Sequence, residues 1–130
     1  RDLGGPSLAD IRGDLHMHST YSDGVHEVSE MAEACRARGL AYCAISDHSY
    51  GLPIAGGVPM PRLLQQHAEI DALNAHWQGA FRVLKGIEAN LRADGSVDMT
   101  SDELATLDIV IASPHSALRK SEDQTARLLY

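Results

Sequence analysis

Two histidines stand two residues apart near the start of the chain, and an aspartate follows them closely; they are His16, His18 and Asp23. Side chains alternate between the two faces of a β-strand, so His16 and His18 are expected to point the same way, opposite to Leu15 and Met17. Two imidazole nitrogens on one face can bind a single metal ion. The spacing therefore predicts one corner of a metal site on the first strand.

Three later apolar segments also end in groups that bind metals. These endings are Ser46-Asp47-His48, Gly86-Ile87-Glu88 and Ser113-Pro114-His115. A single histidine at a strand end is more often a solvated or hydrogen-bonded loop residue than a ligand. Four such endings reverse that expectation, because burying such groups unpaired costs on the order of a few kcal/mol each. The predicted site residues are His16, His18, Asp23, His48, Glu88 and His115.

The two aspartates near these histidines have more than one interpretation. Asp23 precedes Gly24, and the pair fits a simple Asp-Gly turn as well as it fits a ligand. For Asp47 we expect contact with an imidazole, which it would orient without binding the metal itself.

Other polar residues are predicted to have structural roles. His26, His67 and His76 fall on loop or helical stretches and are assigned to the surface or to packing. Lys85 is placed on the face of its strand opposite the site, and the segment from Asp94 to Asp98 is expected to form a solvated, hairpin-like turn.

The elements that position the site alternate between strands and helices. Strands are predicted at residues 13–18, 41–48, 81–90 and 108–115, and helices at 27–38, 61–77, after Thr100 and from Ser121. The 61–77 helix has the apolar stripe Leu63, Leu64, Ile70, Leu73 and Trp77. This alternation predicts βα units and a parallel sheet, in which the carboxyl ends of the strands form the functional face. Residues 51–61, with three glycines and three prolines, form a long loop in a position to cover the site.

Composition narrows the classes of function. The 130 residues suit one small domain, and a net charge of −7 argues against a nucleic-acid binder that works by bulk charge. Bound metal ions would supply local positive charge for a phosphate group. Cys35 and Cys43 do not form a disulfide framework, and we expect both to be reduced and buried in a cytoplasmic protein. No apolar run predicts a membrane span or a signal peptide, and the chain begins at Arg1 as though cut from a longer protein.

The ligand types favour particular metals and a particular reaction. Imidazoles and carboxylates without thiolate suit Zn, Mn or Fe. A carboxylate such as Glu88 can bridge two ions with its two oxygens. Two divalent ions about 3.5–4 Å apart activate water for attack on a phosphoester and stabilise charge on its oxygens.

The motifs together carry a family resemblance. The segments concerned are Asp14-Leu15-His16-Met17-His18-Ser19, Ser22-Asp23-Gly24, Asp47-His48-Ser49, Gly86-Ile87-Glu88 and Ser113-Pro114-His115. In this order they resemble the opening motifs of the PHP (polymerase and histidinol phosphatase) family. The intervening segments 54–57, 70–74, 84–88 and 94–98 are most similar to the PHP domain at the C-terminal end of bacterial family X DNA polymerases. Free-standing PHP phosphoesterases come second.

The resemblance implies a distorted (β/α)7 TIM-like barrel with two or three divalent ions. His16, His18 and Glu88 would hold one ion, Glu88 would bridge to a second that His115 also binds, and Asp23 and His48 would serve a third. The residues carried over as catalytic are His16, His18, Glu88 and His115. The implied activity is phosphoester hydrolysis, at a DNA 3′ end as an exonuclease or 3′-phosphatase, or on a small substrate of the histidinol-phosphate type.

The chain departs from the family barrel in its length. Further family strands carry another histidine and an Asp-x-His pair, whereas this chain stops at Tyr130. Residues 1–130 are therefore expected to be a partial PHP domain, with a lead-in at 1–12 and βα units from 13 to 130, truncated after about four strands. The remaining half-barrel would come from a longer protein or another chain. The isolated chain is expected to be inactive or nearly so.

Two other functional classes remain open. Amidohydrolases also begin a barrel with His-x-His, but the endings Asp47-His48-Ser49 and Gly86-Ile87-Glu88 argue against them. A structural PHP module without activity is disfavoured because all the early ligand positions are filled.

Overall fold

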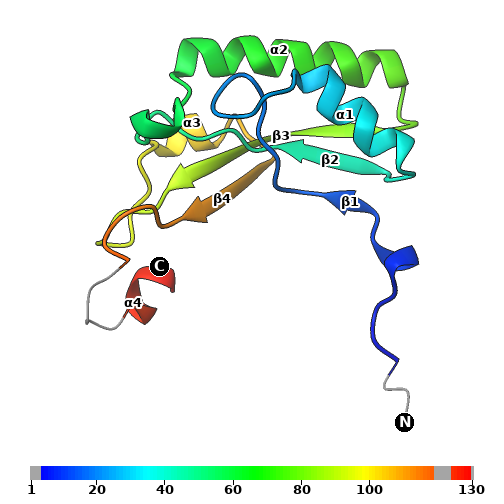
Figure 1. Cartoon of the computed structure of the whole chain (residues 1–130). Helices are drawn as coiled ribbons and strands as arrows, with labels where there is room; N and C mark the ends of the chain where they lie inside the picture. The colour runs from blue at the N-terminus through cyan, green and yellow to red at the C-terminus, as the bar shows by residue number, and fades with distance from the viewer. Residues whose placement is uncertain (1–3, 119–123, 130) are drawn as a thin grey trace.

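The fold is a curled, four-stranded parallel sheet with helices between the strands (Figure 1). The computed structural model describes residues 4–118 and 124–129. The strands are β1 (Gly13–Asp14), β2 (Tyr42–Ile45), β3 (Arg82–Asn90) and β4 (Ile109–Ser113). They pair in sequence order, and all three pairings are parallel. This confirms the predicted βα units and the first part of a truncated, TIM-like α/β barrel.

The helices α1 (Val28–Ala37), α2 (Met60–Trp77) and α3 (Ser101–Leu104) connect successive strands, and α4 (Thr125–Leu128) follows β4. The short 3-10 helices are η1 (Leu8–Asp10) and η2 (Pro53–Ala55). In Figure 1, α1 and α2 lie on the same face of the sheet. The predicted helix start at Ser121 lies outside the described residues. Among the helices that the structure describes, none has both the length and the apolar character needed to cross a membrane.

Local signals in the sequence set the helix ends. The residue after α1 and its cap, Gly39, has φ +80°, which glycine adopts without steric cost. At the start of α3, the side chain of Thr100 accepts a hydrogen bond from the Glu103 backbone N–H, and the Glu103 carboxylate accepts one from the Thr100 N–H. These ends agree with the prediction to within one or two residues.

Most of the predicted stripe on α2 is buried, but one member is not. Leu63 and Ile70 are fully buried, and Leu73 and Trp77 pack against the core. Leu64 is 53% exposed, so its assignment to the stripe was wrong. It follows Leu63 directly, and a rotation of about 100° per residue turns it away from the sheet.

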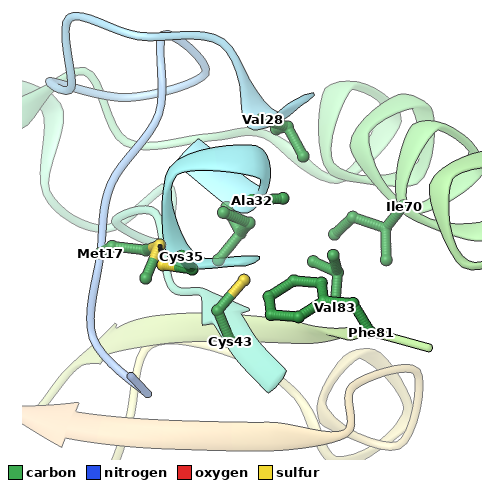
Figure 2. Close-up of a cluster of buried hydrophobic side chains, with 9 residues drawn as sticks. Met17, Val28, Ala32, Cys35, Cys43, Ile70, Phe81 and Val83 are labelled. Atoms are coloured by element: carbon green, nitrogen blue, oxygen red, sulfur yellow. Dashed lines mark hydrogen bonds between the residues drawn. The ribbon is translucent and has the colours of Figure 1, made fainter. Parts of the chain in front are cut away.

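The core fills the space between the sheet and the first two helices. Figure 2 shows part of it, with Val28, Ala32 and Cys35 of α1, Ile70 of α2, and Cys43 and Val83 of the sheet. A second buried cluster lies closer to the site and contains Val58, Leu63, Ile87, Ala89 and Met99. Burying each large aliphatic side chain stabilises the fold by roughly 1.5–3 kcal/mol. As predicted, Cys35 and Cys43 are buried and form no disulfide.

The first strand is shorter than predicted. It ends at Asp14, and the backbone N–H of His16 donates to the Asp14 carboxylate over 3.1 Å. Regular pairing with β2 thus ends two residues before His16. Asp14 and Met17 both line a cavity of about 340 Å³ beside Cys35 of α1. Hydrogen bonds between Met17 and Ser46 still hold this segment beside the end of β2.

Candidate metal centre

The carboxylate of Glu88 lies at the centre of four imidazoles. Its Oε2 atom lies 3.2 Å from His16 Nε2, 3.1 Å from His18 Nε2 and 3.2 Å from His48 Nδ1. Its Oε1 atom lies 3.2 Å from His115 Nε2. The Glu88 residue is only 5% exposed. One buried carboxylate therefore shares its two oxygens among ring nitrogens from three other segments.

The sheet explains this convergence. Glu88 lies near the carboxyl end of β3, between His48, which forms a parallel bridge with it, and Ile111 of β4. His48 and His115 follow the last residues of β2 and β4 by three and two positions. The βα units therefore bring their candidate ligands together near or just beyond the strand ends, at the edge where the carboxyl ends meet.

Asp23 joins the cluster from the loop after β1. Its Oδ1 atom lies 2.7 Å from His18 Nδ1, and its Oδ2 atom lies 3.5 Å from His48 Nε2. Gly24 does not have a positive φ; instead, a Cβ at this position would collide with the backbone carbonyl of His18. Glycine is therefore needed here for the close approach of two backbone segments, a different role from the tight turn considered from sequence.

The donor atoms fall into three groups that could each hold a metal ion. The groups are His16, His18 and Glu88; His18, Asp23 and His48; and His48, Glu88 and His115. Within each group the donor atoms lie within 4.8 Å of one another. The structure thus brings together all six residues that were predicted from sequence.

The pKa directions favour the forms that bind metals. Burial lowers the pKa of His48, although the carboxylates of Glu88 and Asp23 raise it. For Glu88, burial raises the pKa, but the hydrogen bonds of Ser113 and His16 lower it on balance. Burial also raises the pKa of Asp23, and its contact with His18 outweighs that effect. A neutral imidazole and two ionised carboxylates are the ligand states that a divalent cation requires.

One ring nitrogen has an environment that suits a metal. His48 Nδ1 is buried, and although it lies 3.2 Å from Glu88 Oε2, it has no hydrogen-bond partner among the described residues. Leaving a buried polar atom unpaired is costly. A cation shared by the nitrogen and the carboxylate would satisfy both, so the donor set fits a divalent metal ion.

Asp47 does not hydrogen-bond an imidazole directly, contrary to the prediction. It is fully buried, and its carboxylate accepts hydrogen bonds from the backbone and hydroxyl groups of Ser19 and Ser22 and from the Gln66 amide. These partners lie in the loop after His18 and on α2. Asp47 holds the loop between His18 and Asp23.

Asp98 was expected in a solvated turn, and this was wrong as well. It is 6% exposed and accepts hydrogen bonds from Ser49 Oγ at 2.6 Å, from Gly51 N at 2.7 Å and from Asn90 N at 2.9 Å. Asp94 does lie in an exposed turn, where it binds Ser96. Asp98 therefore connects the loop after His48 to the end of β3.

Asn90 and Gln66 were not predicted as functional residues. Asn90 Oδ1 lies 3.4 Å from His115 Nδ1, on the side of that ring away from Glu88. Asn90 follows Glu88 by two positions, so the strand period could have placed it on the same face. Gln66 also had a signal, because it lies three positions after Leu63 and four before Ile70, on the buried stripe of α2.

The remaining polar residues have the predicted structural roles. Lys85 forms an ion pair with Asp71 of α2, at 2.7 Å, and does not contact the cluster. His26 and His76 are exposed, and His67 is buried in the packing of α2.

The chain is similar to known proteins along most of its length. The PHP domain family model matches residues 14–128. Over 115 residues the chain is 53% identical to the DNA polymerase/3′-5′ exonuclease PolX of Bacillus subtilis, covering 88% of this chain and 20% of that protein. It is 32% and 35% identical to proteins named "Probable phosphatase" from Syntrophotalea carbinolica and Acetivibrio thermocellus, covering 78% of this chain and 40% of each relative. The chain thus spans less than half the length of these curated relatives.

PHP phosphoesterases are generally metal-dependent, and the six clustered side chains offer donor atoms of the kind such a site needs. The family match, the relatives and the parallel βα architecture agree: the chain belongs to the PHP domain family.

Proposed function

We propose that the chain provides the metal-binding face of a phosphoesterase that acts on a DNA 3′ end. The observation that carries this proposal is the buried Glu88 carboxylate, whose two oxygens face four imidazoles at 3.1–3.2 Å. A packed core has no need for this arrangement, and an apolar sheet could not tolerate it without compensating charge.

The residues divide naturally among the ions. His16, His18 and Glu88 would hold one, Glu88 would bridge to a second that His115 also binds, and Asp23 with His48 would serve a third. When bound, such ions acidify a water molecule and stabilise charge on the phosphoryl oxygens. Glu88 would supply negative charge to the ions, and the loop from Ser19 to Ser22 would orient His18 and Asp23.

One relative makes a DNA 3′ end the preferred substrate. The relative with 53% identity is named as a polymerase and 3′-5′ exonuclease, and the match covers 88% of this chain. For either kind of phosphoester, the net charge of −7 leaves metal ions as the natural source of attraction for phosphate. Hydrolysis of a small phosphomonoester is the second candidate, and the relatives named as phosphatases support it.

The test compares two substrates in the presence of Mn²⁺. An oligonucleotide with a 3′-phosphate and a small aryl phosphate are each incubated with the chain, alone and as part of a complete PHP barrel. We expect turnover by the complete barrel, little or none by residues 1–130, and a loss of turnover in the Glu88→Gln variant. Equal turnover with glutamine at this position would overturn the proposal. Preference for the aryl phosphate would select the second candidate.

A further inference from the structure

The buried carboxylate of Asp47 is connected to all three residues of one candidate metal group. We infer that Asp47 is a positioning residue that fixes His18, Asp23 and His48 relative to one another and thereby sets the affinity of that group for a divalent cation. This inference rests on the proposed metal-binding function and names a residue on which one of the three groups depends.

Asp47 accepts hydrogen bonds at both of its carboxylate oxygens. Oδ1 accepts from Ser19 N at 2.8 Å and from Ser22 N at 3.2 Å, and Oδ2 accepts from Ser19 Oγ at 2.6 Å. Ser22 Oγ and Gln66 Nε2 donate as well. The residue is fully buried. Five donors compensate the charge, and they hold the carboxylate in one position because both oxygens are used.

Asp47 and its serine partners are direct sequence neighbours of the candidate metal ligands. Ser19 directly follows His18, Ser22 directly precedes Asp23, and Asp47 directly precedes His48. Each residue of the group is therefore the immediate sequence neighbour of a residue in the Asp47 hydrogen-bond network. Each of the other two groups shares only one residue with this group, His18 or His48, and includes Glu88, which lies outside the Asp47 network.

Gln66 attaches this hydrogen-bond network to helix α2. Gln66 lies in the middle of α2, is fully buried, and donates to Asp47 Oδ2 over 2.6 Å. The helix packs on the sheet through Leu63 and Ile70, so its position is set by the core. The loop that carries Asp23 is thus tied through Asp47 to a rigid helix. Such support is what keeps metal ligands in a productive geometry.

The test measures bound metal directly. Purified protein is equilibrated with Mn²⁺ across a dialysis membrane, and bound ions per chain are counted as free Mn²⁺ is raised. The variants are Asp47→Asn and Ser22→Ala; the second removes a single hydroxyl donor from a loop and guards against misfolding. Asn74→Ala is the matched control. Asn74 lies on α2, as Gln66 does, and it hydrogen-bonds the Val83 backbone, away from the cluster.

We expect the Asp47→Asn variant to lose one class of bound Mn²⁺ or to bind it about 10–100-fold more weakly, as is typical when the support of a metal ligand is removed. Ser22→Ala should weaken the same class to a smaller extent, and Asn74→Ala should leave all classes unchanged. Unaltered binding in both Asp47→Asn and Ser22→Ala would overturn the inference while leaving the proposed function intact. Absence of Mn²⁺ binding by the wild-type protein would instead overturn the proposed function.

Discussion

Oε1 of Glu88 lies 3.2 Å from Nε2 of His115, while its other oxygen faces the imidazoles of the first two βα units. The carboxylate therefore has a different set of partners at each oxygen. This division is what a bridge between two cations requires, and it follows from the place of Glu88 on β3, with β2 on one side and β4 on the other.

Replacing Glu88 with glutamine should remove divalent metal binding by the two groups that include Glu88. The amide keeps the shape of the side chain but loses its negative charge and one of its two acceptor oxygens. We expect the affinity for Mn²⁺ to fall by at least about 100-fold, toward the upper end of the effects seen when a metal site is perturbed. Titration calorimetry measures the change. Glu33→Gln, the same substitution on an exposed face of α1, should bind Mn²⁺ like the wild-type protein.

Removing the side chain of Asn90 should affect His115 in particular. Its amide oxygen lies 3.4 Å from Nδ1 of that ring, opposite the nitrogen that faces Glu88. Without this contact the ring is free to rotate, so Asn90→Ala should weaken binding of the ion between Glu88 and His115 by about tenfold or more. Asn90→Asp keeps an oxygen acceptor in place and should restore most of the affinity. Equal loss in both variants would contradict the assigned role.

Adding a methyl group at Gly24 should disturb Asp23. The new Cβ would collide with the backbone carbonyl of His18, so the loop must move away from that residue. We expect Gly24→Ala to lower the affinity for Mn²⁺ of the group formed by His18, Asp23 and His48. Gly79→Ala is a useful comparison for folding, since no atom lies within 4 Å of a Cβ there, although its positive φ adds strain. Crystal structures of both variants would show whether only the first displaces Asp23.

His67 should make the stability of the fold depend on pH. Burial lowers its pKa below the ordinary value of 6.5, and the nearby charge of Lys85 lowers it further. Its Nε2 atom has no hydrogen-bond partner among the described residues. The unfolded chain therefore takes up a proton at higher pH than the folded chain does, so stability is full above about pH 6.5 and falls as the pH drops below that value.

The measurement is the free energy of unfolding by urea at about pH 7.5 and about pH 5.5, on either side of an ordinary histidine pKa. His67→Gln removes the titrating group, so its free energy of unfolding should differ less between the two pH values than that of the wild-type protein. His26→Gln replaces an exposed histidine and should retain the full difference. If the free energy of unfolding of His67→Gln changed with pH as much as that of the wild-type protein, another group would be responsible for the pH dependence.

Much of this architecture could be predicted from the sequence, because its signals are local. Gly39 and the Thr100 capping box mark helix ends, and apolar runs mark the strands. The convergence of the candidate ligands could be predicted because parallel βα units bring strand ends together, so that Glu88 needs only to lie near the end of β3 and His115 just after β4. Their donor chemistry then limits the choice of metal.

The errors arose where tertiary contacts decide the outcome. Asp47 and Asp98 were misjudged because their partners lie far along the chain, on α2 and on the loop after His48. The end of β1 at Asp14 could not be predicted from alternation alone, and Met17 beyond it is buried beside Cys35 of α1. Leu64 was misassigned because two adjacent leucines both fit an apolar stripe until the helix is placed on the sheet.

The most direct test of the metal site is anomalous X-ray diffraction from crystals soaked in Mn²⁺, recorded at the manganese absorption edge. We expect anomalous peaks at the Glu88 carboxylate, with His16 and His18 on one side and His115 on the other. Crystals of Glu88→Gln should lack these peaks. Peaks confined to other parts of the surface, or no peak beside Glu88 at saturating Mn²⁺, would contradict the claim that this cluster binds metal.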